Sequence, residues 1–98
     1  MRNIIYILLI SPLFLIGQGS YNMTLLGSYE WPSTEGNDIW GWVDPSGNEY
    51  ALVGLVDGFA CVNVSDPSNP IQEFYISDIS STWRDVKTWG NYAYVTTE

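Results

Sequence analysis

A pattern of residues that occurs twice in the chain places the strongest constraint on its fold. Seven residues recur in the same order, the first four at a spacing of 43 and the last three at a spacing of 42. The first copies are Trp40, Val43, Gly47, Asn48, Tyr50, Ala51 and Val53, and the second copies are Trp83, Val86, Gly90, Asn91, Tyr92, Ala93 and Val95. We interpret the change of spacing at Glu49 as a one-residue insertion in a turn. A period of this length is typical of folds built from repeated units.

Each unit has the sequence characteristics of short β-strands separated by turns. The strands are rich in β-branched and aromatic residues, and Gly, Pro, Asn and Asp gather between them. We expect strands at residues 25–31, 40–43, 50–55, 59–64, 71–76, 83–86 and 92–97. Asp57-Gly58 between two apolar runs predicts a hairpin with a type I′ turn, which needs positive φ at both central residues. No helical periodicity occurs after residue 20.

The size of the unit predicts the architecture. Four strands in about 42 residues are typical of one β-propeller blade. Strands that are apolar on both faces favour sheets stacked on sheets. We therefore predict an all-β fold, a β-propeller fragment in which residues 20–98 form about one and a half four-stranded blades. Residues 25–31 are expected to be an outer strand that closes the ring. The alternative is a small independent β-domain of three or four strands.

Residues 1–19 have the features of a secretory signal peptide. Arg2 supplies a positive charge, Ile4 to Ile16 form an apolar run, and Gly17 to Ser20 offer small residues for cleavage after Gly17 or Gly19. An uncleaved anchor is disfavoured because the run is shorter than the roughly 20 residues that span a membrane. We predict a protein that is secreted or held at the cell surface, with no stable membrane span after cleavage.

The charge and the absence of histidine exclude several functions. The chain has 11 acidic and 3 basic residues, a formal net charge of −8, and no histidine. Three basic residues cannot form the cationic face that nucleic-acid binding requires, and an anionic membrane surface is an equally poor partner. Without histidine the chain has no Ser-His-Asp or Cys-His site and no imidazole ligand for zinc. We predict no enzyme activity for this stretch.

Neither the cysteine nor the acidic loops predict a cofactor or a metal. Cys61 cannot form an intrachain disulfide, because it has no second cysteine, and it is expected to be a small buried apolar residue. The 44–49 and 66–70 loops faintly resemble calcium loops, but the first has its glycine misplaced and lacks a bidentate acid at its end. Pro and Asn suit turns by themselves. We interpret both loops as solvated turns and expect no cofactor.

Several segments of the chain resemble the choice-of-anchor B family. The matching segments are Trp40 to Pro45, Glu49 to Leu55, Val62 to Pro70 and Ser81 to Val95. That family consists of secreted bacterial proteins built from LVIVD-type repeats, which are β-propeller blades. The resemblance covers residues 25–98, and the Ser81 to Asp85 stretch is its most specific part. It implies an N-terminal fragment of a longer protein with an anchoring segment, and it assigns no reaction and no catalytic residue.

Trp83, Arg84 and Asp85 are the candidate ligand-binding residues. In a propeller the first strand of each blade lines the central channel, and strand alternation places Trp83, Asp85 and Lys87 on one face. An aromatic ring beside Arg or Asp at a channel mouth is suited to a sugar, a peptide or an ion. The alternative, which we favour, is structural: Arg84 and Asp85 tie neighbouring blades by charge-assisted hydrogen bonds while Trp83 packs between sheets.

The predicted function is a non-catalytic binding or adhesion scaffold outside the cell. Its expected partner is an extracellular protein or a carbohydrate. The alternative is the N-terminal part of a secreted propeller hydrolase or lyase whose catalytic residues lie further along a longer chain. The fold by itself does not decide between these two classes.

Overall fold

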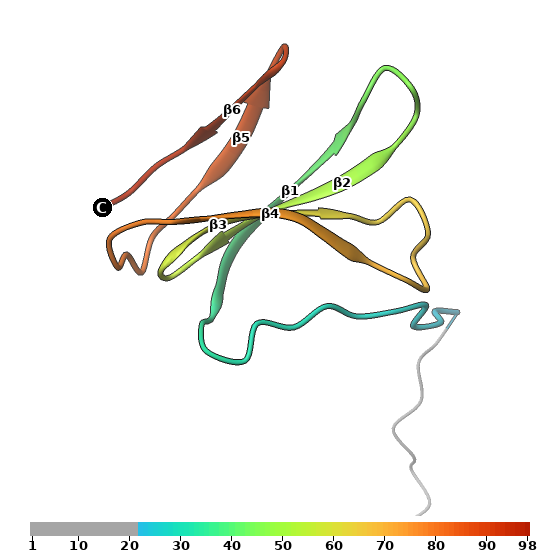
Figure 1. Ribbon diagram of the computed structural model, residues 1–98, viewed down its shortest axis with the longest axis horizontal. Helices are drawn as coiled ribbons and strands as arrows, with labels where there is room; N and C mark the ends of the chain where they lie inside the picture. Colours follow the sequence, from blue (N-terminus) through green and yellow to red (C-terminus); the bar gives the residue numbers. More distant parts are fainter. Residues whose placement is uncertain (1–21) are drawn as a thin grey trace, which may run out of the picture.

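The computed structural model describes residues 22–98, and within them the protein is all-β with no helix. Four strands, β1 (Gly36–Val43), β2 (Glu49–Leu55), β3 (Gly58–Asn63) and β4 (Ile71–Ser77), form an antiparallel sheet in the order β1-β2-β3-β4. Two further strands, β5 (Val86–Trp89) and β6 (Tyr92–Val95), form a separate hairpin beside this sheet (Figure 1). The prediction of an all-β fold is confirmed, and no helix in this part of the chain could cross a membrane. The predicted signal peptide lies outside the described residues.

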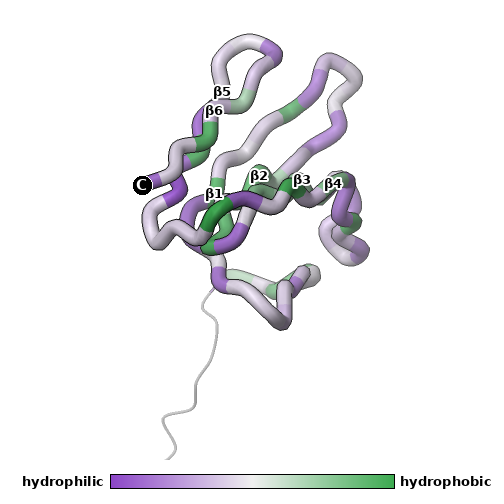
Figure 2. The backbone as a smooth tube through the Cα atoms, turned by 60° about the vertical axis from the view of Figure 1, so that its left-hand side comes forward, coloured by the Kyte–Doolittle hydropathy of each residue, from purple (hydrophilic) through white to green (hydrophobic). Residues whose placement is uncertain are grey.

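The four-stranded sheet is apolar on both faces. Neighbouring residues of a strand point to opposite faces, and in the central strands β2 and β3 the residues on either side are mostly apolar. Leu52, Phe59 and Cys61 face the hairpin and form a buried cluster with Val86. Val53, Leu55 and Ala60 form a second cluster on the opposite face, where Trp31 packs against them. Figure 2 shows apolar residues concentrated along the central strands. The sheet is therefore the middle layer between the hairpin and the segment that precedes β1.

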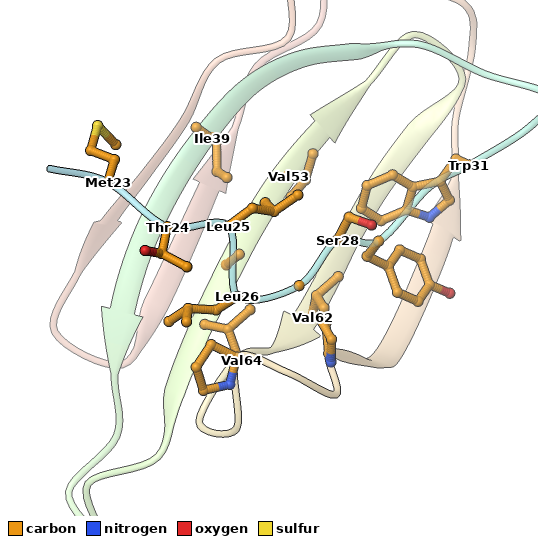
Figure 3. A pocket seen from close by; sticks show the side chains of 15 residues that line it. Met23, Thr24, Leu25, Leu26, Ser28, Trp31, Ile39, Val53, Val62 and Val64 are labelled. Atoms are coloured by element: carbon orange, nitrogen blue, oxygen red, sulfur yellow. The ribbon is translucent and has the colours of Figure 1, made fainter. Parts of the chain in front are cut away.

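The segment that precedes β1 departs from the prediction. Residues 25–31 were expected to be an outer strand, but none of them is in a strand. The segment instead crosses the second face of the sheet as extended chain without backbone pairing (Figure 3). The indole Nε1 of Trp31 donates to Oε1 of Gln72 at 2.8 Å, which fastens the end of the segment to β4. Of residues 25–31, Trp31 alone is partly buried against the sheet, whereas Leu25 and Leu26 are 84% and 61% exposed.

The predicted hairpin between β2 and β3 is confirmed, but the prediction that its turn is of type I′ is wrong. Leu55 pairs with Gly58, so Val56 and Asp57 are the central residues and Gly58 opens β3. None of these residues has a positive φ. Glycine is needed at 58 for space, since an added Cβ would meet the Tyr75 hydroxyl at 2.7 Å and come still closer to the Ile76 carbonyl. The turn is held by the Tyr75 hydroxyl, which donates to Oδ1 of Asp57 at 2.7 Å.

The two glycines of the repeat share an unusual backbone conformation. Gly47 has φ +89° in the β1–β2 connection, and Gly90 has φ +59° in the β5–β6 turn. Side chains disfavour this left-handed region, so glycine is the residue expected at both places. The repeated Gly-Asn pair is therefore a repeated turn. The second unit differs at its start, because residues 83–85 are not in a strand and β5 begins only at Val86.

Candidate functional site

Arg84 is a buried cross-link. Its side chain is 1% exposed, and each guanidinium nitrogen donates to a nearby oxygen. Nε donates to the carbonyl oxygen of Leu55 at 2.8 Å and Nη2 to that of Ile79 at 2.6 Å. Nη1 donates to Oδ2 of Asp78 at 2.6 Å and to Oγ1 of Thr97 at 2.8 Å. Arg84 thus joins β2, the loop after β4 and the chain after β6, so its donors are used within the protein.

The same hydrogen bonds lower the pKa of Asp78, the carboxylate that pairs with Arg84. The pKa of Asp78 lies below its usual value, because the Arg84 guanidinium donates to it, followed by the amide of Ile79 and the hydroxyl of Thr97. The Thr97 hydroxyl donates to Oδ2 of Asp78 at 2.9 Å. Charge-assisted hydrogen bonds of this kind are stronger than those between neutral groups. The expectation that Arg84 ties structural units together agrees with this geometry.

Trp83 and Asp85 lie on the outside of the protein. The exposure alternates along residues 83–87 as expected, with Trp83, Asp85 and Lys87 exposed and Arg84 and Val86 buried. Trp83 is 65% exposed, so the expectation that it packs between the sheets is wrong. Within residues 22–98 the Asp85 carboxylate accepts no hydrogen bond, although the backbone of Asp85 pairs with Thr96. The structure therefore separates the three candidates into a buried cross-link and two exposed side chains.

Two residues that sequence reasoning missed hold the second unit in place. Oδ2 of Asp38, on β1, accepts the backbone N–H of Val86 at 2.8 Å, where β5 begins. The pKa of Asp38 is lowered mainly by this amide, with a further contribution from the amide of Ile39. Oδ1 of Asn37 accepts the backbone N–H of Arg84 at 3.2 Å. A neighbouring pair of polar side chains on β1 thus positions the chain that leads into β5.

The strand pairing shows a different repeat from the one read in the sequence. Ile39 pairs with Val53 and Trp42 with Tyr50, whereas Val86 pairs with Val95 and Trp89 with Tyr92. Since Val53 and Tyr50 correspond to Val95 and Tyr92, the equivalent first strands are Asp38-Ile39-x-x-Trp42 and Asp85-Val86-x-x-Trp89. Their spacing is 47, because the β1–β2 connection is longer than the β5–β6 turn.

The equivalence corrects two pairs of the sequence repeat. Trp40 does not correspond to Trp83, nor Val43 to Val86. The Asp-Ile/Val-x-x-Trp pattern was visible in the sequence and would have given the correct alignment. Asp85 is consequently the second-unit equivalent of Asp38, the residue that binds the start of β5.

Two grooves lie on opposite faces of the four-stranded sheet. The larger, of about 660 Å³, lies beneath residues 23–31, and Figure 3 shows Leu25, Leu26, Val53 and Val62 among its walls. The smaller, of about 370 Å³, lies between the sheet and the hairpin. It is lined by Trp42, Tyr50, Leu52, Cys61, Glu73, Phe74, Thr88, Asn91, Tyr92 and Ala93.

Asp44 and Cys61, which were considered for metal binding and thiol chemistry, make contacts that stabilise the fold. Oδ1 of Asp44 accepts the amides of Ser46 and Asn48, each at 2.9 Å, and Oδ2 accepts the Asn48 side-chain amide at 2.9 Å. These bonds close the turn, and the side-chain amide of Asn48 is the main cause of the lowered pKa of Asp44. Burial raises the pKa of the Cys61 thiol, which disfavours the thiolate. In the described part of the chain, no three His, Cys, Asp or Glu residues form a metal-binding group.

Comparison of the chain with protein-family models, with curated proteins and with solved structures finds no match. The resemblance to the choice-of-anchor B family therefore stays a prediction from the residues that carry it.

Proposed function

We propose that this chain is part of an exported β-propeller of the LVIVD-repeat type, which acts as a non-catalytic binding or adhesion scaffold outside the cell. The observation that carries the proposal is the equivalence of Asp38 and Asp85. Asp38 binds the first amide of the next sheet, and Asp85 occupies the same position one unit later. Such a residue is expected in a fold in which each blade receives the next one by the same contact.

The surface next to this contact supports a binding role. Trp83 lies two residues before Asp85, and its side chain is 65% exposed. An exposed indole offers an apolar face on which a sugar ring or an apolar side chain can pack. This surface suits a carbohydrate or a peptide. Arg84 lends rigidity to the surface from beneath, because it is fastened at every nitrogen.

The test is binding of the full chain to an array of glycans and extracellular proteins. Trp83→Ala is expected to abolish most of the signal on any ligand found. Trp89→Ala is the matched control, because Trp89 is exposed at 80% on the neighbouring hairpin and is not part of the proposed surface. Equal loss in both variants, or no ligand for the unmodified chain, would overturn the binding role.

A further inference from the structure

Asp57 differs from every other aspartate of the chain in the residue that follows it. The chain has six aspartates, and only Asp57 precedes a glycine. The others precede proline, isoleucine or valine, and they are Asp38, Asp44, Asp66, Asp78 and Asp85. Proline lacks a backbone N–H, and a β-branched side chain crowds the backbone nitrogen, whereas glycine leaves it open. Asp57 is therefore the one aspartate whose carboxyl carbon is readily attacked by the next backbone nitrogen.

This attack converts aspartate into isoaspartate in two steps. The Gly58 nitrogen bonds to Cγ of Asp57, the Cγ–OH bond of the protonated acid breaks, and the hydroxyl leaves with the amide proton as one water. Water then adds to either carbonyl of the succinimide ring. Opening at Cγ restores aspartate, whereas opening at the backbone carbonyl of Asp57 gives isoaspartate. The main chain of isoaspartate runs through Cβ and Cγ, so the product has one extra backbone carbon in the turn.

The Tyr75 hydroxyl opposes the first step. It donates to Oδ1 of Asp57 at 2.7 Å and lies 3.0 Å from the backbone carbonyl oxygen of the same residue. A hydrogen bond to a charged acceptor is of the strong kind, and this one is the main reason why the pKa of Asp57 lies below its usual value. The folded protein therefore keeps the carboxylate ionised, and an ionised carboxylate has no hydroxyl to lose.

The backbone on both sides of Asp57 is fastened as well. The Val56 amide donates to the Glu35 carbonyl at 3.0 Å, and the Asp57 carbonyl accepts the Asp78 amide at 2.9 Å. Gly58 is buried and already pairs with β2 at the start of β3. Its nitrogen is thus held in the sheet, and approach to Cγ requires the turn to open.

We propose that Asp57 is a latent site of isoaspartate formation, which the Tyr75 hydroxyl holds unreactive while β4 lies against β3. Where β4 separates from β3, the carboxylate loses its donor and the reaction proceeds. The product does not fit the native turn, because Gly58 lies so close to Tyr75 that an added Cβ would meet the hydroxyl at 2.7 Å. This inference goes beyond the proposed function, since it concerns the β2–β3 turn and needs neither Trp83 nor a ligand.

The test measures isoaspartate at Asp57 over time in the full chain at neutral pH, by electron-transfer mass spectrometry of the peptide that contains it. Tyr75→Phe removes only the hydroxyl and should raise the rate in the folded protein about tenfold, the effect of losing one hydrogen bond to a charged group. Tyr94→Phe is the matched control, because Tyr94 is an exposed tyrosine of β6 outside the turn, and it should leave the rate unchanged. In urea the unmodified protein and both variants should react at one common, faster rate.

Three results would overturn the proposal. They are equal rates for the folded and the urea-unfolded protein, a folded Tyr75→Phe rate no higher than that of Tyr94→Phe, and a difference between the two variants that persists in urea. Amide exchange of β2 and β3 should be the same in Tyr75→Phe as in the unmodified protein. Faster exchange would assign the increase to a loosened hairpin and would overturn the role of the hydroxyl. If Tyr75→Phe fails to fold, the comparison of folded with urea-unfolded unmodified protein still decides whether the turn protects Asp57.

Discussion

The β1–β2 and β5–β6 hairpins have the same design and different surroundings. Both carry Asp-Ile/Val-x-x-Trp at the first strand, with Asp38 inside β1 and Asp85 directly before β5, and Tyr-Ala-x-Val on the second strand, in the same pairing register. In the first hairpin Leu52 is 5% exposed, because β3 and the second hairpin cover it. In the second, the equivalent Tyr94 is 56% exposed. The comparison teaches that burial in this fold comes from the neighbouring strand and sheet and not from the hairpin itself.

The largest effect is expected at the link between the two hairpins. Arg84→Met removes the donors that bind the carbonyls of Leu55 and Ile79, and it leaves the carboxylate of Asp78 with neutral donors only. Loss of a buried charged partner should lower the free energy of unfolding by about 4 kcal/mol. Urea denaturation monitored by tryptophan fluorescence measures it. Lys87→Met is the control, because Lys87 is exposed, and should cost less than about 1 kcal/mol. Similar losses in the two variants would refute the cross-link.

The next effect tests the difference between the hairpins directly. Leu52→Ala leaves a cavity in the cluster with Phe59, Cys61 and Val86 and should cost about 3 kcal/mol. Tyr94→Ala at the equivalent position should cost less than about 1 kcal/mol, since its side chain is largely in water. The same urea titration gives both values. If Tyr94→Ala were as costly as Leu52→Ala, the second hairpin would be covered in solution and the comparison would be broken.

The smallest effect is a change in the pH dependence of stability at Asp38. Its folded pKa is lowered from 3.8 chiefly by the amides of Val86 and Ile39. The carboxylate therefore contributes stability that is complete above its unfolded pKa and is lost as the pH falls through the lower folded value. Asp38→Asn should be less stable than the unmodified protein near neutral pH, and the difference should shrink toward acid.

The matched control for Asp38 is its equivalent in the second unit. Asp85→Asn should leave the urea midpoint close to that of the unmodified protein at each pH, because the Asp85 carboxylate accepts no hydrogen bond within residues 22–98. Midpoints measured at a series of pH values compare the two variants. A larger change of the urea midpoint in Asp85→Asn than in Asp38→Asn would contradict the assignment of Asp38 as the residue that holds the start of β5.

Local chemistry made much of the fold predictable. The predicted strands at 50–55, 59–64 and 71–76 lie within a residue or so of β2, β3 and β4, because β-branched and aromatic runs between turn residues are strong signals. The hairpin at Asp57-Gly58 was predicted, although its turn type was wrong. Residues 25–31 are rich in apolar and aromatic residues but form no strand, because local composition does not supply the partner strand that backbone pairing requires.

The candidate site was less predictable than the fold. The sequence singled out Trp83, Arg84 and Asp85, but it could not tell which of them would be buried. Arg84 is inside because four oxygens from three separate segments, at residue 55, at residues 78–79 and at residue 97, converge on it. Trp83 is outside although it is a large aromatic residue. Asn37 and Asp38 were overlooked because two polar residues at the start of a strand have no meaning until their distant partners are known.

By itself the sequence determined the all-β class, the repeated turn glycines and the acidic, histidine-free composition, since these depend on local conformational preferences and on residue counts. Only the tertiary structure decided which of the two alignments of the repeat is correct, and it alone placed Arg84 in the interior and Val86 against Asp38. The contact between Asp38 and Val86 joins residues 48 positions apart, and Arg84 binds a carbonyl 29 positions away. Cross-strand pairing and the burial of polar groups are settled only when distant segments pack together, because an unpaired buried donor or acceptor is too costly to keep.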